Sequence, residues 1–253
     1  MPVAAIRGVV LLAAPGALEG VDRYLAKSRI ELYRVEVLRQ QPVPPSAWLP
    51  RVARAGPIDT VLVTSRFAVG AGVLPWRHRR NRIAPPPEFW AAGPRTAEAL
   101  RRLGIPKVRH GSTLGSAGIV AKLGRRHRRI LYLRSDQAGP SLARALRGRG
   151  HRVTDVVVYR VEARSSLREK DRRRIRNAAV LVATSSSAIT GLRRGIGSPT
   201  FRSLARSTPM VVLGPQTARR ARALGFRSVS VAPGTGAQRF TRHLLRELNH
   251  ARP

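Results

Sequence analysis

The stretch Gly214-Pro215-Gln216-Thr217-Ala218 decides the fold, because an earlier copy of it occurs as Gly93-Pro94-Arg95-Thr96-Ala97. Each copy follows a short apolar run and precedes a segment of helical pattern that ends in Leu-Gly. Thr64-Ser65 likewise recurs as Thr184-Ser185. The copies lie about 120 residues apart, a period far longer than that of a solenoid repeat. The sequence therefore predicts a duplicated domain, and the paired loops are the first place to look for a site.

The rest of the chain alternates between apolar runs and helical patterns. Val9 to Leu12 lies within a continuous apolar run, and Ile130 to Leu133 repeats it in the second half. Runs that are apolar on both faces are typical of buried parallel strands. Each half reads as strand, helix, strand, strand, helix, strand, helix, strand, helix. This order places the chain in the α/β class and predicts open parallel sheets with helices on both faces.

Three further stretches carry expectations about the path of the chain. Gln41 to Pro45 is rich in proline, which cannot continue a strand ladder, so a linker is expected there. Arg77 to Pro87 is basic and then rich in proline, which predicts an exposed loop. Within the long β-branched run that begins at Val153, Arg160-Val161-Glu162 echoes Arg34-Val35-Glu36 and is interpreted as its copy.

Length and composition describe a globular protein. The 253 residues, 43% of them hydrophobic, suffice for two modest domains or one large one. No apolar run approaches the roughly 20 residues of a membrane span. The apolar start, Met1 to Ala14, is interpreted as an opening strand, with a secretory signal as the alternative. Because the chain has no cysteine, disulfides and thiolate sites are excluded, and a reducing cytoplasm fits.

The charge of the chain is unusual. It has 48 Lys and Arg against 13 Asp and Glu, a formal net charge of +35. Such a surface attracts polyanions. Three explanations stay open: a compositional bias toward arginine, attraction of a substrate with many carboxylates, and binding of nucleic acid. Nucleic acid is the least favoured, because no basic stretch alternates with stacking aromatics.

Helix starts at the carboxyl ends of the predicted strands form the candidate binding site. A helix start offers unpaired N–H groups and a partial positive charge, and therefore binds anions. In open parallel sheets, ligands bind beyond the carboxyl ends of the strands. Two matched sets of such helix starts are expected to face one another across a cleft and to bind a polycarboxylate. The first set comprises Thr64, Ser65, Gly93 and Thr96, with Ser135 as a further helix start, and the second comprises Thr184, Ser185, Ser186, Gly214, Gln216 and Thr217. The alternative for each Ser or Thr is a helix cap worth about 1 kcal/mol.

Tyr159 is the candidate for proton chemistry. It ends the run Asp155 to Val158, where the chain is expected to cross back between domains. A phenol at a cleft could donate a proton or a hydrogen bond, and the alternative is an aromatic residue packed on an apolar strand. No glycine-rich nucleotide loop competes, and the histidines do not show the spacing of a metal site.

Taken together, these motifs resemble those of the uroporphyrinogen-III synthase family. The resemblance covers the chain from about Val9 to Leu248, and its order and spacing are more specific than any single motif. The stretches that carry it are Val61–Val69, Ala92–Leu100, Val157–Arg160, Thr184–Ala188 and Leu213–Ala218.

The resemblance implies two similar flavodoxin-like domains with parallel sheets, joined by a two-stranded connection. One domain is discontinuous, 1–38 plus 163–253, and the other, 39–162, is inserted into it. The implied reaction closes the linear tetrapyrrole hydroxymethylbilane, inverts its terminal pyrrole ring and releases water, without cofactor or metal, in heme, siroheme and cobalamin biosynthesis. By matched position, Tyr159 is implied to help the hydroxyl depart. Carboxylate binding, largely through backbone N–H groups, is implied for Ser65, Thr96, Ser185 and Thr217.

One departure from the family pattern follows the first strand. Many members have an arginine there, where this chain has Ala13-Ala14-Pro15, so Arg134 is expected to take over one carboxylate contact. A catalytically degenerate tetrapyrrole-binding protein on the same fold is therefore the alternative, beside a nucleic-acid-binding one. We further expect a cytoplasmic monomer without membrane contact, which receives its substrate by hand-over from hydroxymethylbilane synthase.

Overall fold

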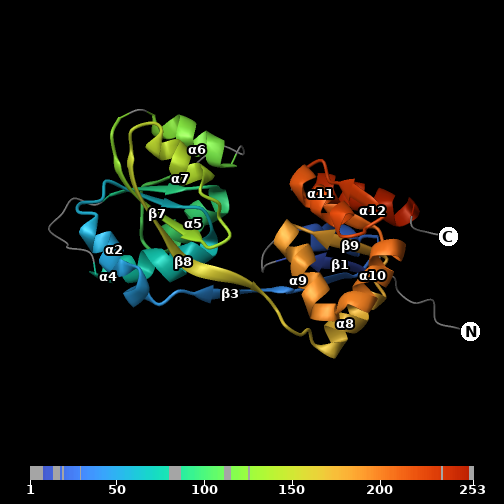
Figure 1. The fold of residues 1–253 in the computed structure, drawn as a ribbon. Coiled ribbons are helices and arrows are strands. Elements are labelled where there is room, and N and C mark those ends of the chain that lie inside the picture. Colours follow the sequence, from blue (N-terminus) through green and yellow to red (C-terminus); the bar gives the residue numbers. More distant parts are fainter. Residues whose placement is uncertain are drawn as a thin grey trace, which may run out of the picture. The chain divides into compact units, whose positions relative to one another are not determined.

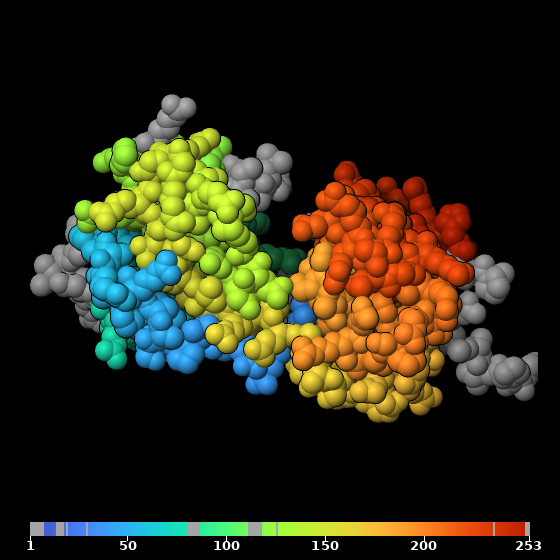
Figure 2. All heavy atoms as spheres, in the orientation of Figure 1, coloured from blue at the N-terminus to red at the C-terminus, as the bar shows by residue number. Residues whose placement is uncertain are grey.

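The computed structural model describes residues 8–13, 18, 20–28, 30–79, 87–110, 115–124, 126–234 and 236–250. The chain divides into two compact units (Figure 1). Unit 1 comprises Met1–Arg39 with Glu162–Pro253, and unit 2 comprises Gln40–Val161. The division expected from the family, 1–38 plus 163–253 and 39–162, differs from this by one residue at each boundary. In the space-filling view of Figure 2, blue to yellow atoms form the surface of unit 2, and mainly yellow-orange to red atoms form that of unit 1.

Unit 1 is built on a parallel sheet with the strand order β11-β10-β9-β1-β2. Its strands are β1 Val9–Leu12, β2 Leu32–Val35, β9 Val180–Ala183, β10 Met210–Val212 and β11 Val229–Val231. Its helices are α1 Val21–Ala26, α8 Glu169–Arg176, α9 Ser186–Ile196, α10 Ser198–Ser207, α11 Pro215–Ala223 and α12 Ala237–His250. This strand order is that of flavodoxin-like sheets.

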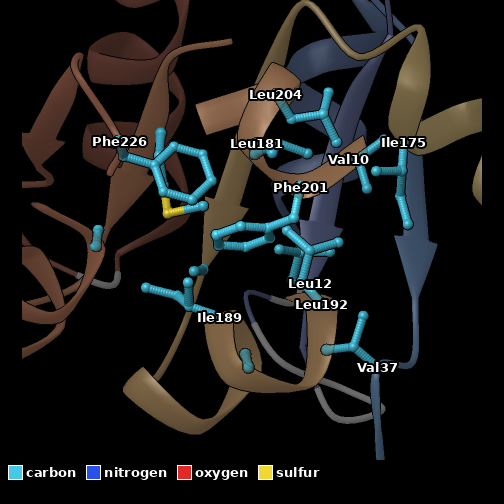
Figure 3. Packing of buried hydrophobic residues seen from close by; sticks show 14 of the residues in the cluster. Val10, Leu12, Val37, Ile175, Leu181, Ile189, Leu192, Phe201, Leu204 and Phe226 are labelled. Carbon is cyan, nitrogen blue, oxygen red and sulfur yellow. The ribbon is translucent and has the colours of Figure 1, made fainter. Parts of the chain in front are cut away.

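The strands of unit 1 send alternate side chains into two separate cores. Val10 packs with residues of α8, α9, α10 and α11, whereas its neighbour Leu11 packs with residues of α1 and α12. In the first core, Phe201 of α10 meets Phe226 edge to face, with ring centroids 5.5 Å apart (Figure 3). Both faces of the sheet are therefore covered by helices, as the continuous apolar strand sequences predict.

Unit 2 is built on a sheet with the strand order β3-β8-β7-β4-β5-β6. Its strands are β3 Leu38–Pro42, β4 Thr60–Val63, β5 Glu88–Ala91, β6 Val108–His110, β7 Arg129–Ser135 and β8 Arg152–Ala163. Its helices are the 3-10 turn η1 Pro45–Ala47, α2 Leu49–Arg54, α3 Arg66–Ala68, the π segment η2 Val69–Val73, α4 Leu74–Arg79, α5 Pro94–Arg102, α6 Gly115–Leu123 and α7 Ser141–Arg147. From β8 to β6 the strands are parallel.

The chain passes from unit 1 to unit 2 within β3 and returns within β8. The N–H of Val43 donates to the carbonyl of Val158, and the N–H of Arg164 donates to that of Val37, at 2.9 and 3.0 Å. An early residue of one segment thus pairs with a late residue of the other. The edge strand β3 therefore runs antiparallel to β8, and the two form the two-stranded connection.

The two sheets have the same spatial order, although the chain visits their strands in a different sequence. The order β8-β7-β4-β5-β6 in unit 2 matches β2-β1-β9-β10-β11 in unit 1. The registers agree as well, since Leu133 pairs with Val156 as Leu12 pairs with Val35. The prediction of two similar flavodoxin-like domains with parallel sheets is confirmed, and unit 2 has the topology of a circular permutation of unit 1.

The two Leu-Gly copies end their helices in the same way. Gly104 follows α5 and Gly225 follows α11, with φ of 74° and 98°. Their N–H groups donate to the carbonyls of Arg101 and Arg222, at 2.8 and 2.9 Å. Because glycine adopts this left-handed conformation without the strain of a Cβ, the repeated Leu-Gly has a backbone cause.

Three sequence-based expectations about the chain path were wrong. Gln41 and Pro42 continue β3 instead of ending the ladder, because a proline at the last position of an edge strand displaces no ladder bond of a central strand. Arg77 to Arg79 belong to α4, which buries Trp76, and not to a loop; residues 80–86 lie outside the described residues. The counterpart of Val35 is Val156, so the Arg160-Val161-Glu162 echo does not mark equivalent strand positions.

Helix α10 was not predicted. It follows Gly197, whose φ of 80° ends α9, and it has a proline in its first turn. Phe201, Leu204 and Ala205 form its buried face at helical spacing. The signal was therefore present in the sequence, in the Gly-Ser-Pro start and the i, i+3, i+4 pattern.

Candidate functional site

The carboxyl ends of the parallel strands in unit 2 bring its predicted site residues to one edge of the sheet. Thr64 and Ser65 follow β4, and Gly93 follows the neighbouring β5. On the other side of β4, β7 ends at Ser135, whose register partner on β8 is Tyr159. Because neighbouring parallel strands end at a common edge, residues far apart in sequence form one polar row.

Ser65 contacts both a helix start and Tyr159. Its Oγ accepts a hydrogen bond from the N–H of Ala68 at 3.1 Å and so caps α3. The hydroxyl of Tyr159 donates to the same oxygen at 2.9 Å. The Tyr159 ring is 5% exposed and lies against Phe67, with ring centroids 4.9 Å apart. Tyr159 is therefore a packed aromatic and a hydrogen-bonded phenol at once, so the two alternatives of the sequence analysis do not exclude each other.

A β-bulge directs Tyr159 toward Ser65. The pairing of β7 with β8 is regular up to Arg134 and Val157, and then skips a residue so that Ser135 pairs with Tyr159. In a regular strand Val158 and Tyr159 would face opposite sides of the sheet. Both instead belong to the core that includes residues of α3 and α5. The extra residue therefore places the phenol on the face where α3 begins.

Tyr132 on β7 lies beside the polar row of unit 2 and was not singled out from the sequence. It is 2% exposed. Burial raises the pKa of the Tyr132 phenol, while a hydrogen bond with the Thr64 side chain and the charge of Arg134 act in the opposite direction. Tyr132 belongs to the core on the other face of the sheet from Tyr159. The consecutive residues Thr64 and Ser65 thus each contact one tyrosine, on opposite faces of the sheet. The Tyr132 hydroxyl is the one polar side-chain group in the apolar run Ile130 to Leu133, and it could have drawn attention to this residue in the sequence.

Gly93 and Gly214 are the N-cap residues of α5 and α11, and each is followed by proline. Their φ values, −165° and −168°, are extended and open to any residue. A Cβ at either position would meet no described atom within 4 Å. Neither backbone conformation nor packing therefore requires glycine here. The missing side chain leaves space beside the start of each helix, where Pro94 and Pro215 themselves carry no N–H.

Thr96 and Thr217 are the third residues of α5 and α11. They are only 6% and 8% exposed, so their side chains lie largely within the fold. The N–H of Thr96 donates to the carbonyl of Gly93 at 3.1 Å. Any contact of these turns with an anion would therefore be made mainly by backbone N–H groups and not by the threonine hydroxyls.

Arg134 is engaged inside unit 2. Its Nε and Nη2 donate to Oδ2 of Asp155 at 3.2 and 3.0 Å. Its Nη1 donates to the carbonyls of Ser135 and Ala138 at 3.0 and 3.1 Å. A substrate carboxylate would have to compete with these partners, and the contact of Arg134 with substrate stays a prediction. Ala14 and Pro15, at the position of the family's arginine, lie outside the described residues.

Ser135 does not open a helix, and this expectation was wrong. It is the last residue of β7, and its Oγ accepts from the N–H of Ala138 at 3.2 Å. The side chain thereby closes a turn, and α7 begins only at Ser141. A serine after a strand forms such local turns as readily as helix caps, so the residue type alone could not distinguish them.

The second predicted set lies at the equivalent edge of unit 1. Thr184 to Ser186 follow β9, and Gly214 to Thr217 follow its neighbour β10. Ser185 caps α9, accepting from the N–H of Ala188 at 3.2 Å, and its Oγ lies 3.5 Å from that of Ser187. In position Ser185 corresponds to Ser65, because β9 and β4 occupy the same place in their sheets. The sequence thus predicted correctly that each unit contains a polar row of helix starts.

Other features of the described residues bear on the class of site. A cavity of about 700 Å³ in unit 2 shares Arg66 and Phe67 with the start of α3, and it is otherwise lined by Pro42 to Pro45, Gly70, Ala71 and Pro75. Within the described ranges, no three His, Asp or Glu side chains lie close enough together to hold a metal ion. No helix in these ranges is both long and apolar enough to cross a lipid bilayer.

Fold and site together define a class of protein: a two-unit α/β protein with flavodoxin-like sheets, one permuted relative to the other, and hydroxyl-rich helix starts at the carboxyl edge of each sheet. The family model described as Uroporphyrinogen-III synthase HemD matches residues 24–241. The chain belongs to the uroporphyrinogen-III synthase family, a family of ring-closing lyases. The resemblance seen in the sequence is thereby confirmed.

Solved structures agree on the fold. A substituted uroporphyrinogen III synthase from Thermus thermophilus is 19% identical, and the match covers 96% of this chain and 99% of that one, with a TM-score of 0.60. The uroporphyrinogen-III synthetase of Helicobacter pylori is 17% identical over 95% of this chain and 99% of its own, with a TM-score of 0.61. The comparison with curated proteins found no match.

Proposed function

We propose that this chain converts hydroxymethylbilane to uroporphyrinogen III by closing the ring, inverting the terminal pyrrole and releasing water. The observation that carries the proposal is the family match over residues 24–241. The hydrogen-bonded phenol of Tyr159 at the carboxyl edge of the unit 2 sheet supports it. No cofactor or metal enters the proposed reaction.

The chemistry asks little of an acid. When the hydroxymethyl C–O bond breaks, the oxygen leaves as water and the pyrrole stabilises the remaining cation by resonance. The larger task is to hold the chain so that the last ring attacks through its substituted carbon, which is catalysis by orientation. We assign the hydroxyl pair of Tyr159 and Ser65 a hydrogen bond to the departing hydroxyl, and we assign the helix starts to the orientation of the chain.

The substrate carries two carboxylates per ring, which suits two rows of helix starts. In unit 2 the proposed contacts are the first-turn N–H groups after Gly93 and the polar residues Thr64, Ser65, Thr96, Arg134 and Ser135. In unit 1 they are Thr184, Ser185, Ser186, Gly214, Gln216 and Thr217. The open space at both N-cap glycines supports this assignment. The apolar cavity beside Phe67, with its single Arg66, would suit the face and acid group of a pyrrole ring.

The test is incubation with hydroxymethylbilane, followed by oxidation and separation of the porphyrin isomers. We expect isomer III to predominate, and a parallel sample without protein to give isomer I by uncatalysed closure. Isomer I alone in both samples would overturn the proposal. Tight binding of the macrocycle without turnover would instead favour the catalytically degenerate protein.

The net charge of +35 keeps nucleic acid as a second candidate ligand. Binding to DNA or RNA would weaken steeply with added salt.

We propose in addition that the protein acts as a monomer in the cytoplasm and takes hydroxymethylbilane from its synthase, because free substrate closes to the wrong isomer. Sedimentation of the pure protein tests the monomer. Isomer ratios with the synthase coupled, against those with added free substrate, test the hand-over.

A further inference from the structure

The side-chain oxygen of Ser65 uses both of its hydrogen-bond acceptor positions. A serine oxygen has two acceptor positions and one proton to donate. In Ser65 both acceptor positions are taken, by the N–H of Ala68 at 3.1 Å and by the hydroxyl of Tyr159 at 2.9 Å. The phenolic proton is likewise committed to Ser65. The pair therefore has one donor left, the Ser65 hydroxyl, and one acceptor, the phenolic oxygen.

The equivalent residue of unit 1 shows that capping does not require the second bond. Ser185 caps α9 with the same geometry, at 3.2 Å from the N–H of Ala188. Among the described residues no phenol donates to Ser185, and the hydroxyl of Ser187 lies 3.5 Å from its Oγ. After Val35, the last residue of β2, the chain continues as Glu36-Val37, without a hydroxyl. The duplication thus provides a helix cap with a tyrosine and a matched cap without one.

The ring of Tyr159 is held independently of its hydroxyl. It is 5% exposed, it packs on Phe67, and the bulge opposite Ser135 fixes its face of the sheet. What this packing leaves free is rotation of the O–H about the phenolic C–O bond. Among the contacts of the described residues, the bond to Ser65 fixes that rotation, so the phenol presents its lone pairs and not its proton.

We propose that Ser65 is a positioning residue for Tyr159, which fixes the direction of the phenolic proton so that the two hydroxyls act on the substrate as one unit. This inference rests on the proposed function. It predicts that removing either hydroxyl costs nearly as much as removing both. If Ser65 were only a helix cap, the fold-changes in rate caused by removing the two hydroxyls would simply multiply.

The test is a double-mutant cycle with a matched control cycle. Ser65→Gly removes the hydroxyl while glycine remains a good N-cap, so α3 should still form. We expect Ser65→Gly and Tyr159→Phe each to lower kcat about tenfold, the worth of one hydrogen bond, and the double variant to fall no further. In the control cycle, the fold-changes in kcat/KM caused by Ser185→Gly and Tyr159→Phe should multiply. The effect of Ser185→Gly should appear mainly in KM.

Ser65→Thr keeps a hydroxyl and a cap, and should restore kcat to within about twofold of the original. Multiplicative effects of Ser65→Gly and Tyr159→Phe would overturn the inference and leave Ser65 as a cap alone. A wild-type protein that forms no isomer III would overturn the proposed function instead, so the two failures are distinguishable. If Ser65→Gly does not fold, the same cycle is run with Ser65→Ala, which also lacks the hydroxyl and costs α3 about 1 kcal/mol of capping. Multiplicative effects of Ser65→Ala and Tyr159→Phe would overturn the inference equally.

Discussion

Asp155 on β8 and Arg34 on β2 occupy equivalent positions in the two sheets but carry opposite charges. Asp155 is the register partner of Tyr132, and Arg34 is that of Leu11. Each forms an ion pair with the helix before it: Asp155 with Arg147 of α7 at 2.6 Å, and Arg34 with Asp22 of α1 at 2.7 Å. The duplication has thus kept a strand-to-helix ion pair and reversed its polarity.

The two pairs should differ in their contribution to stability. The Asp155 side chain is 14% exposed and also binds Arg134, whereas Asp22 is 54% exposed. We expect Asp155→Asn to lower the free energy of unfolding of unit 2 by about 3 kcal/mol, because it leaves the largely buried guanidinium group of Arg134 without its carboxylate and also breaks the pair with the half-exposed Arg147. The matched Asp22→Asn should cost about 0.5 kcal/mol or less.

Denaturant titration measures both changes. Trp48, Trp76 and Trp90 all lie in unit 2, so tryptophan fluorescence follows that unit alone. Circular dichroism follows both units and reports the unfolding of Asp22→Asn.

Burial works to raise the pKa of Asp155, but hydrogen bonds from Arg147 and Arg134 outweigh it and hold the pKa below its ordinary value. Its stabilisation should therefore be present at neutral pH and be lost in strong acid, as the pH falls through that lowered pKa. Equal costs for the two variants would contradict this account.

His151 should make unit 2 sensitive to mild acid. It is 3% exposed, its Nε2 lies 3.2 Å from the carbonyl of Gly124, and its Nδ1 has no partner among the described residues. Burial lowers the pKa of the imidazole, and this effect outweighs the opposite effect of the hydrogen bond to the carbonyl of Gly124. As pH falls below about 6.5, the unfolded chain therefore binds a proton that the folded one does not, and stability declines.

The measurement for His151 is the fluorescence-detected free energy of unfolding between pH 7 and pH 5. We expect it to fall by at most about 1.4 kcal/mol per pH unit from this residue. His151→Gln should remove that part of the slope. His243→Gln, in unit 1, should leave the tryptophan signal unchanged. A slope that persists in His151→Gln would place the titrating group elsewhere.

The N-cap glycines offer a test of anion binding that spares the fold. Gly93→Ser and Gly214→Ser each place a side chain where a Cβ meets no described atom within 4 Å. Serine caps well, so the melting temperature should stay the same or rise slightly. Its side chain would fill the space through which the proposed substrate carboxylate reaches the helix start, and KM should rise about tenfold for one charged hydrogen bond.

Gly236→Ser is the matched control for these glycine variants. Gly236 precedes α12, accepts from the N–H of Phe240 at 2.9 Å, and also has open space at its Cβ. It belongs to neither predicted row, so its KM should not change. An unchanged KM in Gly93→Ser and Gly214→Ser would exclude these two turns from the binding site.

Tyr159→Phe should slow turnover without abolishing it. The departing hydroxyl leaves a stabilised cation, so a lost hydrogen bond should cost about tenfold and not the larger factors of strong acid catalysis. The ring remains packed on Phe67, and folding should be preserved. Tyr24→Phe, at a tyrosine that is 39% exposed, serves as the control. If the rate of isomer III formation does not change in Tyr159→Phe, Tyr159 contributes only packing.

Prediction from sequence succeeded where the determinants are local. Gly104 and Gly225 end their helices through their own backbone conformation, and Ser65 and Ser185 cap theirs through a bond three residues away. It failed where the same residue type has two local uses. Ser135 closes a turn instead of opening a helix. Pro42 ends an edge strand instead of breaking it.

The duplication, the order of strands and helices other than α10, and the chemical character of the two rows follow from the sequence alone, because each is encoded in neighbouring residues and repeated. Only the tertiary structure decided which side chains meet. Ser65 and Tyr159 are 94 positions apart, and a bulge between β7 and β8 sets the face on which the phenol lies. Arg134 is engaged by Asp155, which β8 places opposite Tyr132, two residues before Arg134 on β7. Such partnerships depend on strand register, which is fixed by the packing of the whole sheet and not by any single stretch of chain.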